Sequence, residues 1–348
     1  MIIKRKHLII IIVIIICITK VPGLIVGATT NSEEEDSEEE VQDTAATVSV
    51  GEEFVSSEAA IVMDFDTGLI IYEYNADILR VPASMAKMAA VYVIFDAIRD
   101  GLVSYETRVE ISESLSLFSY NRGFSNVPMP EESSYTVREL LDVVIVRSAS
   151  AATVALAEAI FGSEEVLVAK MNEKAVQLDI EATFFDSWGR SPHNRISAHG
   201  MAELTRALIK EYPEVLDITS KREVYFDERS YRSTNLLLGE YDGINGFKTG
   251  FTNPAGWCFT GTAQQDGRRI ISVTMGSEYG YRFPDSTVLL NYGFENYSMV
   301  IASHFRSEIL EESFPQFNNT TLVPIMTYRI YESRYLEMRN LAIALNEG

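Results

Sequence analysis

Strand patterns stand at both ends of the central part of this chain, and helix patterns occupy the residues between them. Near its start, AAIVMDF and LIIYEYN flank Asp66-Thr67-Gly68, an arrangement typical of a β-hairpin. Near its end, residues 244–250, WCFTGTA and RRIISVTMG read as three further strands. The sequence therefore predicts an α/β mixed fold, with a largely antiparallel sheet flanked by helices and a helical subdomain inserted between its two halves.

The middle of the chain carries apolar residues at helical spacing. VRELLDVVIV (137–146), AATVALAEAIF (151–161) and EEVLVAKMNEKAVQL (164–178) predict three helices. A further helix is expected to begin at Ser84, just after Pro82, and another near 284–292. We see no internal repeat, and residues 54–298 are expected to form one domain.

The first 28 residues have the order of a secretory signal peptide. Basic residues at positions 4–6 precede an apolar run at 8–18, and Val26-Gly27-Ala28 offers small residues for cleavage. The run is shorter than the roughly 20 apolar residues that span a membrane. We therefore expect an extracytoplasmic protein, either secreted or at the outer face of the cytoplasmic membrane or cell wall. An uncleaved anchor over residues 1–28 is the alternative.

Acidic residues dominate the rest of the chain. Residues 29–53 contain the run SEEEDSEEE and read as an acidic disordered linker. The whole chain has 29 basic and 50 acidic residues and a net charge of −21. Such a charge argues against nucleic acid as a partner and disfavours broad adhesion to anionic lipid.

The cysteines and histidines indicate neither a disulfide nor a metal site. Cys17 would leave with the signal peptide, so Cys258 would remain alone. The sequence has no CxxC, no HExxH and no cluster of His and Cys. We expect no metal and no cofactor.

Residues 299–348 read as a C-terminal tail with an amphipathic helix. A helix packed on its own domain is the expectation, and peripheral attachment to a membrane is the alternative. The stretch lacks the basic face that membrane-surface helices use. The apolar face of this predicted helix would hold Tyr331, Tyr335, Met338, Ala342 and Leu345.

Lys87 is the only charged residue in VPASMAKMAAVYVIF (81–95), and Ser84 lies one helical turn before it. An amine in apolar surroundings has a pKa below its usual value of about 10.4. A neutral amine beside a hydroxyl can act as general base for a serine nucleophile. The plainer alternative is that Ser84 caps the helix and Lys87 reaches solvent, although a capping box would have Glu or Gln at position 87.

The triplet Ser148-Ala149-Ser150 lies between two predicted helices. A hydroxyl in such a loop could relay a proton between Lys87 and a leaving group. Ser150 also suits the N-cap of a helix that begins at Ala151. The triplet alone does not decide between these two interpretations.

A third motif, Lys248-Thr249-Gly250, follows DGING. The lysine and threonine could bind a carboxylate, and the glycine would let a backbone approach a ligand closely. Phe247 stands where a phosphate-binding loop requires glycine, which argues against such a loop. A lysine that protects the edge of a sheet is the alternative.

The order Ser-x-x-Lys, Ser-x-Ser, Lys-Thr-Gly resembles the signature of penicilloyl-serine enzymes. From about Phe54 to Tyr297 the chain resembles the D-alanyl-D-alanine carboxypeptidases, the low-molecular-mass penicillin-binding proteins. The matching blocks are PASMAK, YTVRELL, ALAEAIFGSEE, MNEKAVQL, GFKTGFTNPAGWC and LLNYGFENY.

This resemblance implies a β-lactamase/transpeptidase-like fold over 54–298 and a serine peptidase that removes the terminal D-Ala of peptidoglycan stem peptides. It also implies inhibition by β-lactams. The implied catalytic residues are Ser84 as nucleophile, Lys87 as its base and Ser148 as proton relay. The implied substrate-binding residues are Ser150, Lys248, Thr249, Gly250, Phe251 and Arg282, with the backbone N–H groups of Ser84 and Phe251 as the oxyanion hole.

One residue departs from the family pattern, whose second motif ends in Asn where this chain has Ser150. The shorter side chain is expected to lose a contact to substrate or to Lys87. This leaves open a weakly active or non-catalytic cell-wall-binding homologue on the same scaffold. A β-lactamase-like hydrolase is a further alternative, but the chain shows no ExxLN segment between the second and third motifs.

Overall fold

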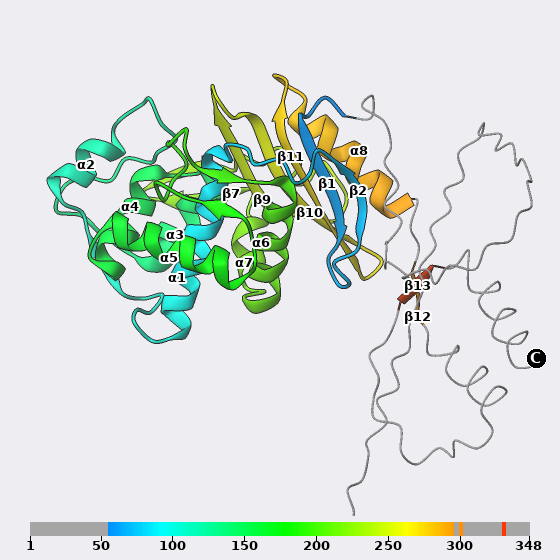
Figure 1. Ribbon diagram of the computed structural model, residues 1–348. Coiled ribbons are helices and arrows are strands. Elements are labelled where there is room, and N and C mark those ends of the chain that lie inside the picture. Colours follow the sequence, from blue (N-terminus) through cyan, green and yellow to red (C-terminus); the bar gives the residue numbers. More distant parts are fainter. Residues whose placement is uncertain (1–54, 296–298, 302–328, 332–348) are drawn as a thin grey trace, which may run out of the picture.

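The computed structural model describes residues 55–295, 299–301 and 329–331. Its largest sheet has five strands in the order β2-β1-β11-β10-β9, and every neighbouring pair is antiparallel (Figure 1). The predicted antiparallel sheet built from both ends of the chain is therefore confirmed. Its strands are β1 (Ala59–Asp64), β2 (Ile70–Tyr74), β9 (Ile244–Thr252), β10 (Gly256–Gln265) and β11 (Arg268–Ser277).

Strand β1 is apolar on both faces because the sheet is covered on both sides. Its residues alternate between two hydrophobic clusters, as the two-residue period of a strand requires. Ile61 and Met63 join the larger cluster with the helices, whereas Ala60 and Val62 join a smaller one with Leu289 of α8 (Arg282–Glu295). Figure 1 shows α8 on one face of the sheet and most other helices on the opposite side.

The remaining helices form the predicted helical part of the molecule. The structure places α3 at the predicted residues, starts α4 one residue before the prediction and ends α5 one residue early. The short helices α2 and α7 and the longer α6 were not predicted. The bounds are η1 (Ala83–Ala86), α1 (Lys87–Arg99), α2 (Glu113–Ser119), α3 (Val137–Val146), α4 (Ser150–Phe161), α5 (Glu164–Gln177), α6 (Ala198–Glu211) and α7 (Val215–Thr219).

Four two-stranded sheets complete the described residues, and the sequence predicted none of them. They pair β3 (Arg108–Glu110) with β4 (Ser134–Thr136), β5 (Ala182–Thr183) with β6 (Arg195–Ile196), β7 (Glu223–Phe226) with β8 (Arg229–Arg232), and β12 (Met299–Ile301) with β13 (Arg329–Tyr331).

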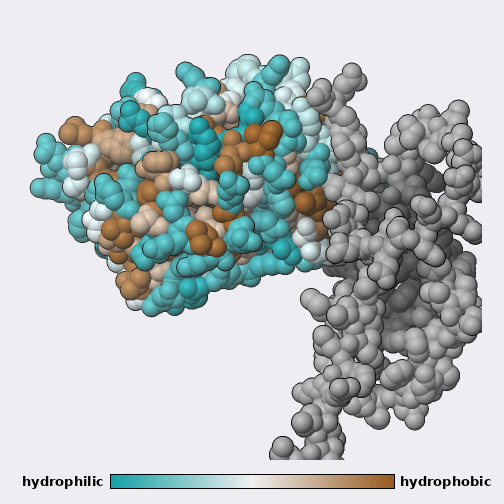
Figure 2. Space-filling view, in the orientation of Figure 1, coloured by the Kyte–Doolittle hydropathy of each residue, from teal (hydrophilic) through white to brown (hydrophobic). Residues whose placement is uncertain are grey.

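Several predictions concern the ends of the chain. Tyr331 ends strand β13, so the prediction that it belongs to a helix is wrong. The rest of that predicted helix, the signal peptide at 1–28 and the acidic linker at 29–53 lie outside the described residues. Within those residues, no helix combines the length and apolar character needed to cross a bilayer. Figure 2 shows a face on which hydrophobic residues form separate patches among hydrophilic ones.

Candidate active site

Ser84 lies in a single 3₁₀ turn, η1, that leads directly into α1. The helical segment thus begins at Ala83, one residue before the prediction, and Lys87 is the first residue of the α-helix proper. Ala83 has a φ of 50°, which only a tightly held backbone imposes on a residue other than glycine. Ser84 is half-buried while its neighbours on both sides are buried, so its hydroxyl is the accessible group of this turn.

Lys87 is completely buried and its amine meets three oxygens. Nζ donates to Ser84 Oγ at 3.2 Å, to Ser150 Oγ at 3.3 Å and to the Trp188 carbonyl at 2.7 Å. Burial lowers the pKa of Lys87 to about 7, and the charges of Asp186 and Glu164 oppose that shift. Near neutral pH a large fraction of this amine is therefore uncharged and able to accept a proton from Ser84.

The second motif forms the turn between α3 and α4. Ser148 has a φ of 65°, and its buried Oγ has no hydrogen-bond partner in the described part of the chain. Ser150 is the first residue of α4, so the interpretation of Ser150 as N-cap is wrong. The N-cap is Ala149, and the backbone N–H of Ala151 instead donates to Asn126 Oδ1 at 2.8 Å. Ser150 is thereby free to contact Lys87, so the expected loss of that contact does not occur.

The third motif lies in β9, at the edge of the large sheet. Lys248 is buried, and its Nζ donates to the Thr249 carbonyl at 3.1 Å. Burial, together with the nearby charges of Lys87 and Arg282, holds the pKa of Lys248 well below its usual value. Thr249 Oγ1 donates to Thr234 Oγ1 at 2.8 Å. A buried amine with so few acceptors provides a favourable position for an anion.

Gly250 allows the first and third motifs to touch backbone to backbone. A Cβ at this position would lie 2.6 Å from the Pro82 carbonyl oxygen and 3.2 Å from Ala83 Cβ. The glycine is thus required by packing against the Ser84 turn, whereas the sequence suggested close approach to a ligand. The next residue, Phe251, is 45% exposed and stacks on Trp257 with ring centroids 4.2 Å apart.

Arg282 opens α8 and lies against the same strand. Its Nη1 donates to the Gly250 carbonyl at 3.4 Å, and its guanidinium lies 4.7 Å from the ring centroids of both Trp257 and Phe283. Burial lowers the pKa of Arg282 to about 10, so it is still a cation at neutral pH. The structure therefore brings Arg282 to the end of the third motif.

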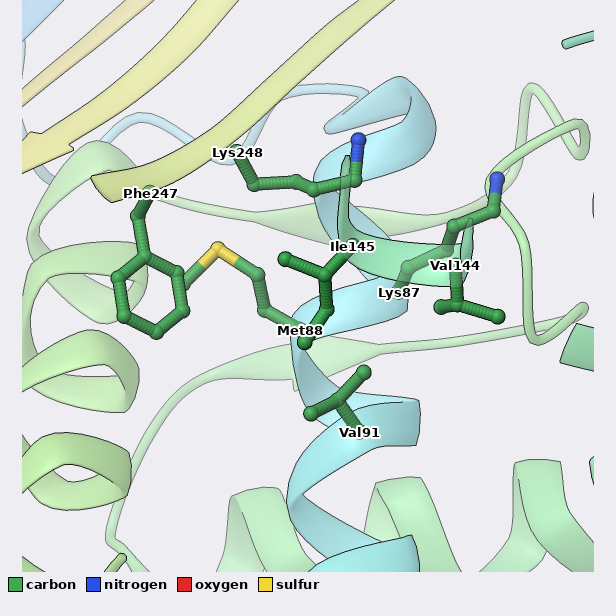
Figure 3. A pocket seen from close by; sticks show the side chains of 7 residues that line it. All are labelled: Lys87, Met88, Val91, Val144, Ile145, Phe247 and Lys248. Atoms are coloured by element: carbon green, nitrogen blue, oxygen red, sulfur yellow. The ribbon is translucent and has the colours of Figure 1, made fainter. Parts of the chain in front are cut away.

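Lys87 and Lys248 both line one small cavity (Figure 3). In this view the two side-chain nitrogens lie at one side of the cavity, and Val91 lies at the opposite side. The apolar lining explains why both amines are poorly solvated. The lining residues are Lys87, Met88, Val91, Val144, Ile145, Phe247 and Lys248.

A loop at 184–191, which the sequence analysis did not single out, completes the site. The Asp186 carboxylate accepts hydrogen bonds from the backbone N–H groups of residues 188–191, which fixes the Trp188 carbonyl on Lys87. Gly189 has a φ of 90°, and a Cβ there would lie 1.9 Å from the Ala83 carbonyl oxygen. The sequence FFDSWGRSP indicates a loop, but it carries no signal that this loop reaches a buried lysine.

The described residues contain no group of three or more His, Cys, Asp or Glu side chains that could hold a metal ion. Cys258 is a buried free thiol. The site brings together two buried amines with lowered pKa values, those of Lys87 and Lys248, the guanidinium of Arg282, and the hydroxyls of Ser84, Ser148, Ser150 and Thr249.

Comparison with known proteins gives the family of the chain. The family model described as D-alanyl-D-alanine carboxypeptidase matches residues 45–279. The chain is 31% identical to D-alanyl-D-alanine carboxypeptidase DacF of Bacillus subtilis (strain 168) over 264 residues, which cover 74% of this chain and 66% of that protein. The chain thus spans about two thirds of the length of the curated relatives that it matches.

Solved structures show the same fold. Penicillin binding protein 5 from Haemophilus influenzae superposes with a TM-score of 0.69 at 30% identity, over 72% of this chain and 74% of the other. Penicillin-binding protein D2 from Listeria monocytogenes, in its ampicillin-bound form, superposes with a TM-score of 0.62 at 30% identity, over 69% of this chain and 98% of the other. From its family-model match and these relatives, the chain belongs to the D-alanyl-D-alanine carboxypeptidase family.

Proposed function

We propose that this protein is a serine-type D-Ala-D-Ala carboxypeptidase that acts through an acyl-enzyme on Ser84. The observation that carries the proposal is the fully buried Lys87, whose amine lies 3.2 Å from Ser84 Oγ and has a pKa of about 7. A base of that pKa next to a half-exposed hydroxyl is suited to nucleophilic catalysis at neutral pH.

In the acylation step, the neutral Lys87 amine takes the Ser84 proton as Oγ attacks the carbonyl carbon between the two D-alanines. The backbone N–H groups of Ser84 and Phe251 stabilise the oxyanion that forms. The C–N bond then breaks, and the leaving amine receives a proton through Ser148, whose buried Oγ has no hydrogen-bond partner among the described residues. Free D-Ala departs, and the acyl group is held as an ester on Ser84.

In the deacylation step, a water molecule attacks the ester carbon while Lys87 accepts a proton from that water. The C–O bond to Ser84 breaks, Ser84 regains its proton, and the shortened peptide leaves. β-Lactams would form the same ester, which accounts for their expected action as inhibitors. No metal or cofactor enters either step.

Substrate binding is assigned to the second and third motifs. Lys248, Thr249 and Arg282 would bind the terminal carboxylate. Burial leaves the amine of Lys248 and the guanidinium of Arg282 poorly solvated, so a bound carboxylate would favour the charged form of both, while Thr249 would add a hydroxyl. Gly250 and Phe251 would present the strand edge to the peptide, with Ser150 at its other side. A peptide ending in D-Ala-D-Ala, as in peptidoglycan stem peptides, provides the required carboxylate next to the bond that is cleaved.

The proposed substrate lies outside the cytoplasm, which fits the signal-peptide pattern at 1–28. We place the protein in the secreted fraction or at the outer face of the membrane or cell wall, with 54–298 as its penicillin-binding domain. The hydrogen bond between Ser150 and Lys87 supports an enzyme over a non-catalytic cell-wall-binding homologue.

The decisive experiment measures D-Ala release and covalent labelling by a tagged penicillin. The wild-type protein should release D-Ala from a peptide ending in D-Ala-D-Ala and carry the label on the peptide 81–95. Ser84→Ala should lose both, whereas Ser104→Ala, at a surface turn, should keep both. A label that persists in Ser84→Ala would refute the mechanism, and labelling without any release of D-Ala would refute the proposed substrate.

A further inference from the structure

Three aromatic rings form a cluster beside the candidate nucleophile. The ring centroids of Phe118 and Trp188 are 5.2 Å apart, those of Phe124 and Trp188 5.0 Å, and those of Phe118 and Phe124 6.0 Å. The rings come from the end of α2, from the loop that follows it and from the 184–191 loop. All three are only partly buried, so the aromatic cluster presents apolar surface that the described part of the chain does not cover.

This aromatic cluster is continuous with the active site. The Trp188 carbonyl accepts from Lys87 Nζ at 2.7 Å, and the Trp188 ring centroid lies 5.9 Å from the same nitrogen. On its other side, Asn126 Nδ2 donates to the Phe118 carbonyl at 2.9 Å, while Asn126 Oδ1 accepts from Ala151 of α4. The cluster is therefore held at a fixed position between Lys87 and the start of α4.

Arg190 adds a positive charge at the edge of the aromatic cluster. Its guanidinium lies 5.3 Å from the Phe124 ring centroid and is exposed. No carboxylate forms an ion pair with it among the residues that the structure describes. In a chain with 50 acidic residues, a guanidinium stacked on a ring without an acidic partner is available to a ligand carboxylate.

The two parts of the bound substrate, on either side of the bond that is cleaved, must extend from Ser84 in different directions. The terminal carboxylate is assigned to Lys248 and Arg282, on the side of β9 and α8. The acyl half then extends away from that side, and the aromatic cluster lies on the side of α2 and α4. A peptide bound in this way would place the residue before the two D-alanines near the rings.

We propose that Phe118, Phe124, Trp188 and Arg190 form a subsite for that residue, selecting a side chain with an aliphatic stem and a terminal carboxylate. The stem would lie on the aromatic faces and the carboxylate would meet the guanidinium. This inference rests on the proposed carboxypeptidase function. It adds a preference for acidic peptides that the three motifs alone do not imply.

The test uses the full chain and four peptides of the form acetyl-X-D-Ala-D-Ala, with X as L-Glu, L-Gln, L-Lys or Gly. We expect kcat/KM for the Glu peptide to exceed that for the isosteric Gln peptide by about three- to tenfold, with Lys lowest of the three long side chains. In Arg190→Gln the Glu and Gln peptides should become equal, and in Arg190→Glu the Lys peptide should become the better substrate.

Arg138→Gln is the matched control, since Arg138 is also exposed and lies 4.2 Å from a ring centroid, that of Tyr105 in another part of the molecule. It should leave the Glu-to-Gln ratio unchanged. Phe124→Leu should lower kcat/KM for the Gln peptide relative to the Gly peptide by about fivefold. Penicillin labelling of each variant reports that Ser84 and its surroundings are intact.

The outcomes separate this inference from the proposed function. Absence of labelling and of D-Ala release in the wild-type protein overturns the carboxypeptidase itself. Labelling and release with equal rates for the Glu and Gln peptides overturn only the subsite. A Glu preference that persists in Arg190→Gln also overturns it, because another group would then bind the carboxylate.

Discussion

At the scale of single residues, the buried amine of Lys87 should set the pH range in which the protein reacts with penicillin. The base is the neutral amine, so reactivity is present above the pKa and is lost as pH falls through it. With a pKa of about 7, the second-order acylation rate should be half-maximal near pH 7 and fall about tenfold per unit below it. Stopped-flow labelling over pH 5–9 measures this profile, and a flat profile would contradict Lys87 as the base.

Ser150, which replaces the family's Asn, should contribute to reactivity and not to folding. Its Oγ accepts from Lys87, whereas the backbone N–H of Ala151 in the first turn of α4 donates to Asn126. Loss of one hydrogen bond of about 0.5–1.5 kcal/mol predicts a two- to tenfold slower acylation in Ser150→Ala, with little change in Tm.

Ser163 provides a control with the opposite expected effect, on stability and not on acylation. Its Oγ caps α5 by accepting from the Val166 N–H, so Ser163→Ala should lose about 1 kcal/mol of stability and acylate at the normal rate. Measuring both the acylation rate and the Tm of each variant distinguishes Ser150→Ala from Ser163→Ala. A lower Tm with unchanged acylation in Ser150→Ala would show that the Lys87 contact has no part in the chemistry.

At the scale of secondary-structure elements, the contact between the 184–191 loop and the Ser84 turn depends on Gly189. Gly189→Ala would place a methyl group 1.9 Å from the Ala83 carbonyl oxygen, so the turn or the loop has to move. We expect loss of penicillin labelling. Gly101 is the control, because it too has a positive φ, 73°, but has nothing within 4 Å of its Cβ position.

Gly101→Ala should therefore cost only the backbone strain, about 1–2 kcal/mol, and keep its labelling. Equal labelling of the two variants would mean that the 184–191 loop does not hold the nucleophile. Thermal unfolding separates this local effect from general loss of structure.

The elements that the sequence predicts well are those with a local signal. Helix α3 is predicted at its full length, and in the structure Thr136 and Glu139 form a capping box at its start. The strands of the large sheet have between five and ten residues, which is enough for an apolar pattern to show in the sequence. By contrast, β5 and β6 have two residues each, too few for any periodicity.

The contacts of the candidate site also divide into local ones, which the sequence predicts, and distant ones, which it does not. Ser84 and Lys87 are only three residues apart, so their contact can be predicted from the sequence. The carbonyl of Trp188 and the hydrogen bond from Ala151 to Asn126 involve distant segments, and any residue can supply a carbonyl. Such contacts depend on packing and leave no pattern in the sequence.

At the scale of the whole molecule, the protein is expected to be exported and to begin near Thr29. The apolar run at 8–18 is too short to span a bilayer, and small residues follow it. Intact-mass measurement and N-terminal sequencing of the protein from culture test this prediction. Recovery of the protein from the membrane fraction with residues 1–28 still attached would instead support the uncleaved anchor.

The pairing of β1 with β11 has a consequence for the newly made chain. A chain that crosses a membrane from its N-terminus delivers β1 early, but the partner residues 270–275 arrive late. Until then β1 is an apolar strand with one unpaired edge, which is a site for aggregation. The Ser84 turn likewise waits for β9 to pack against it. The packing of the Ser84 turn against β9 is thus a property of the completed chain, and folding through such distant contacts is slow.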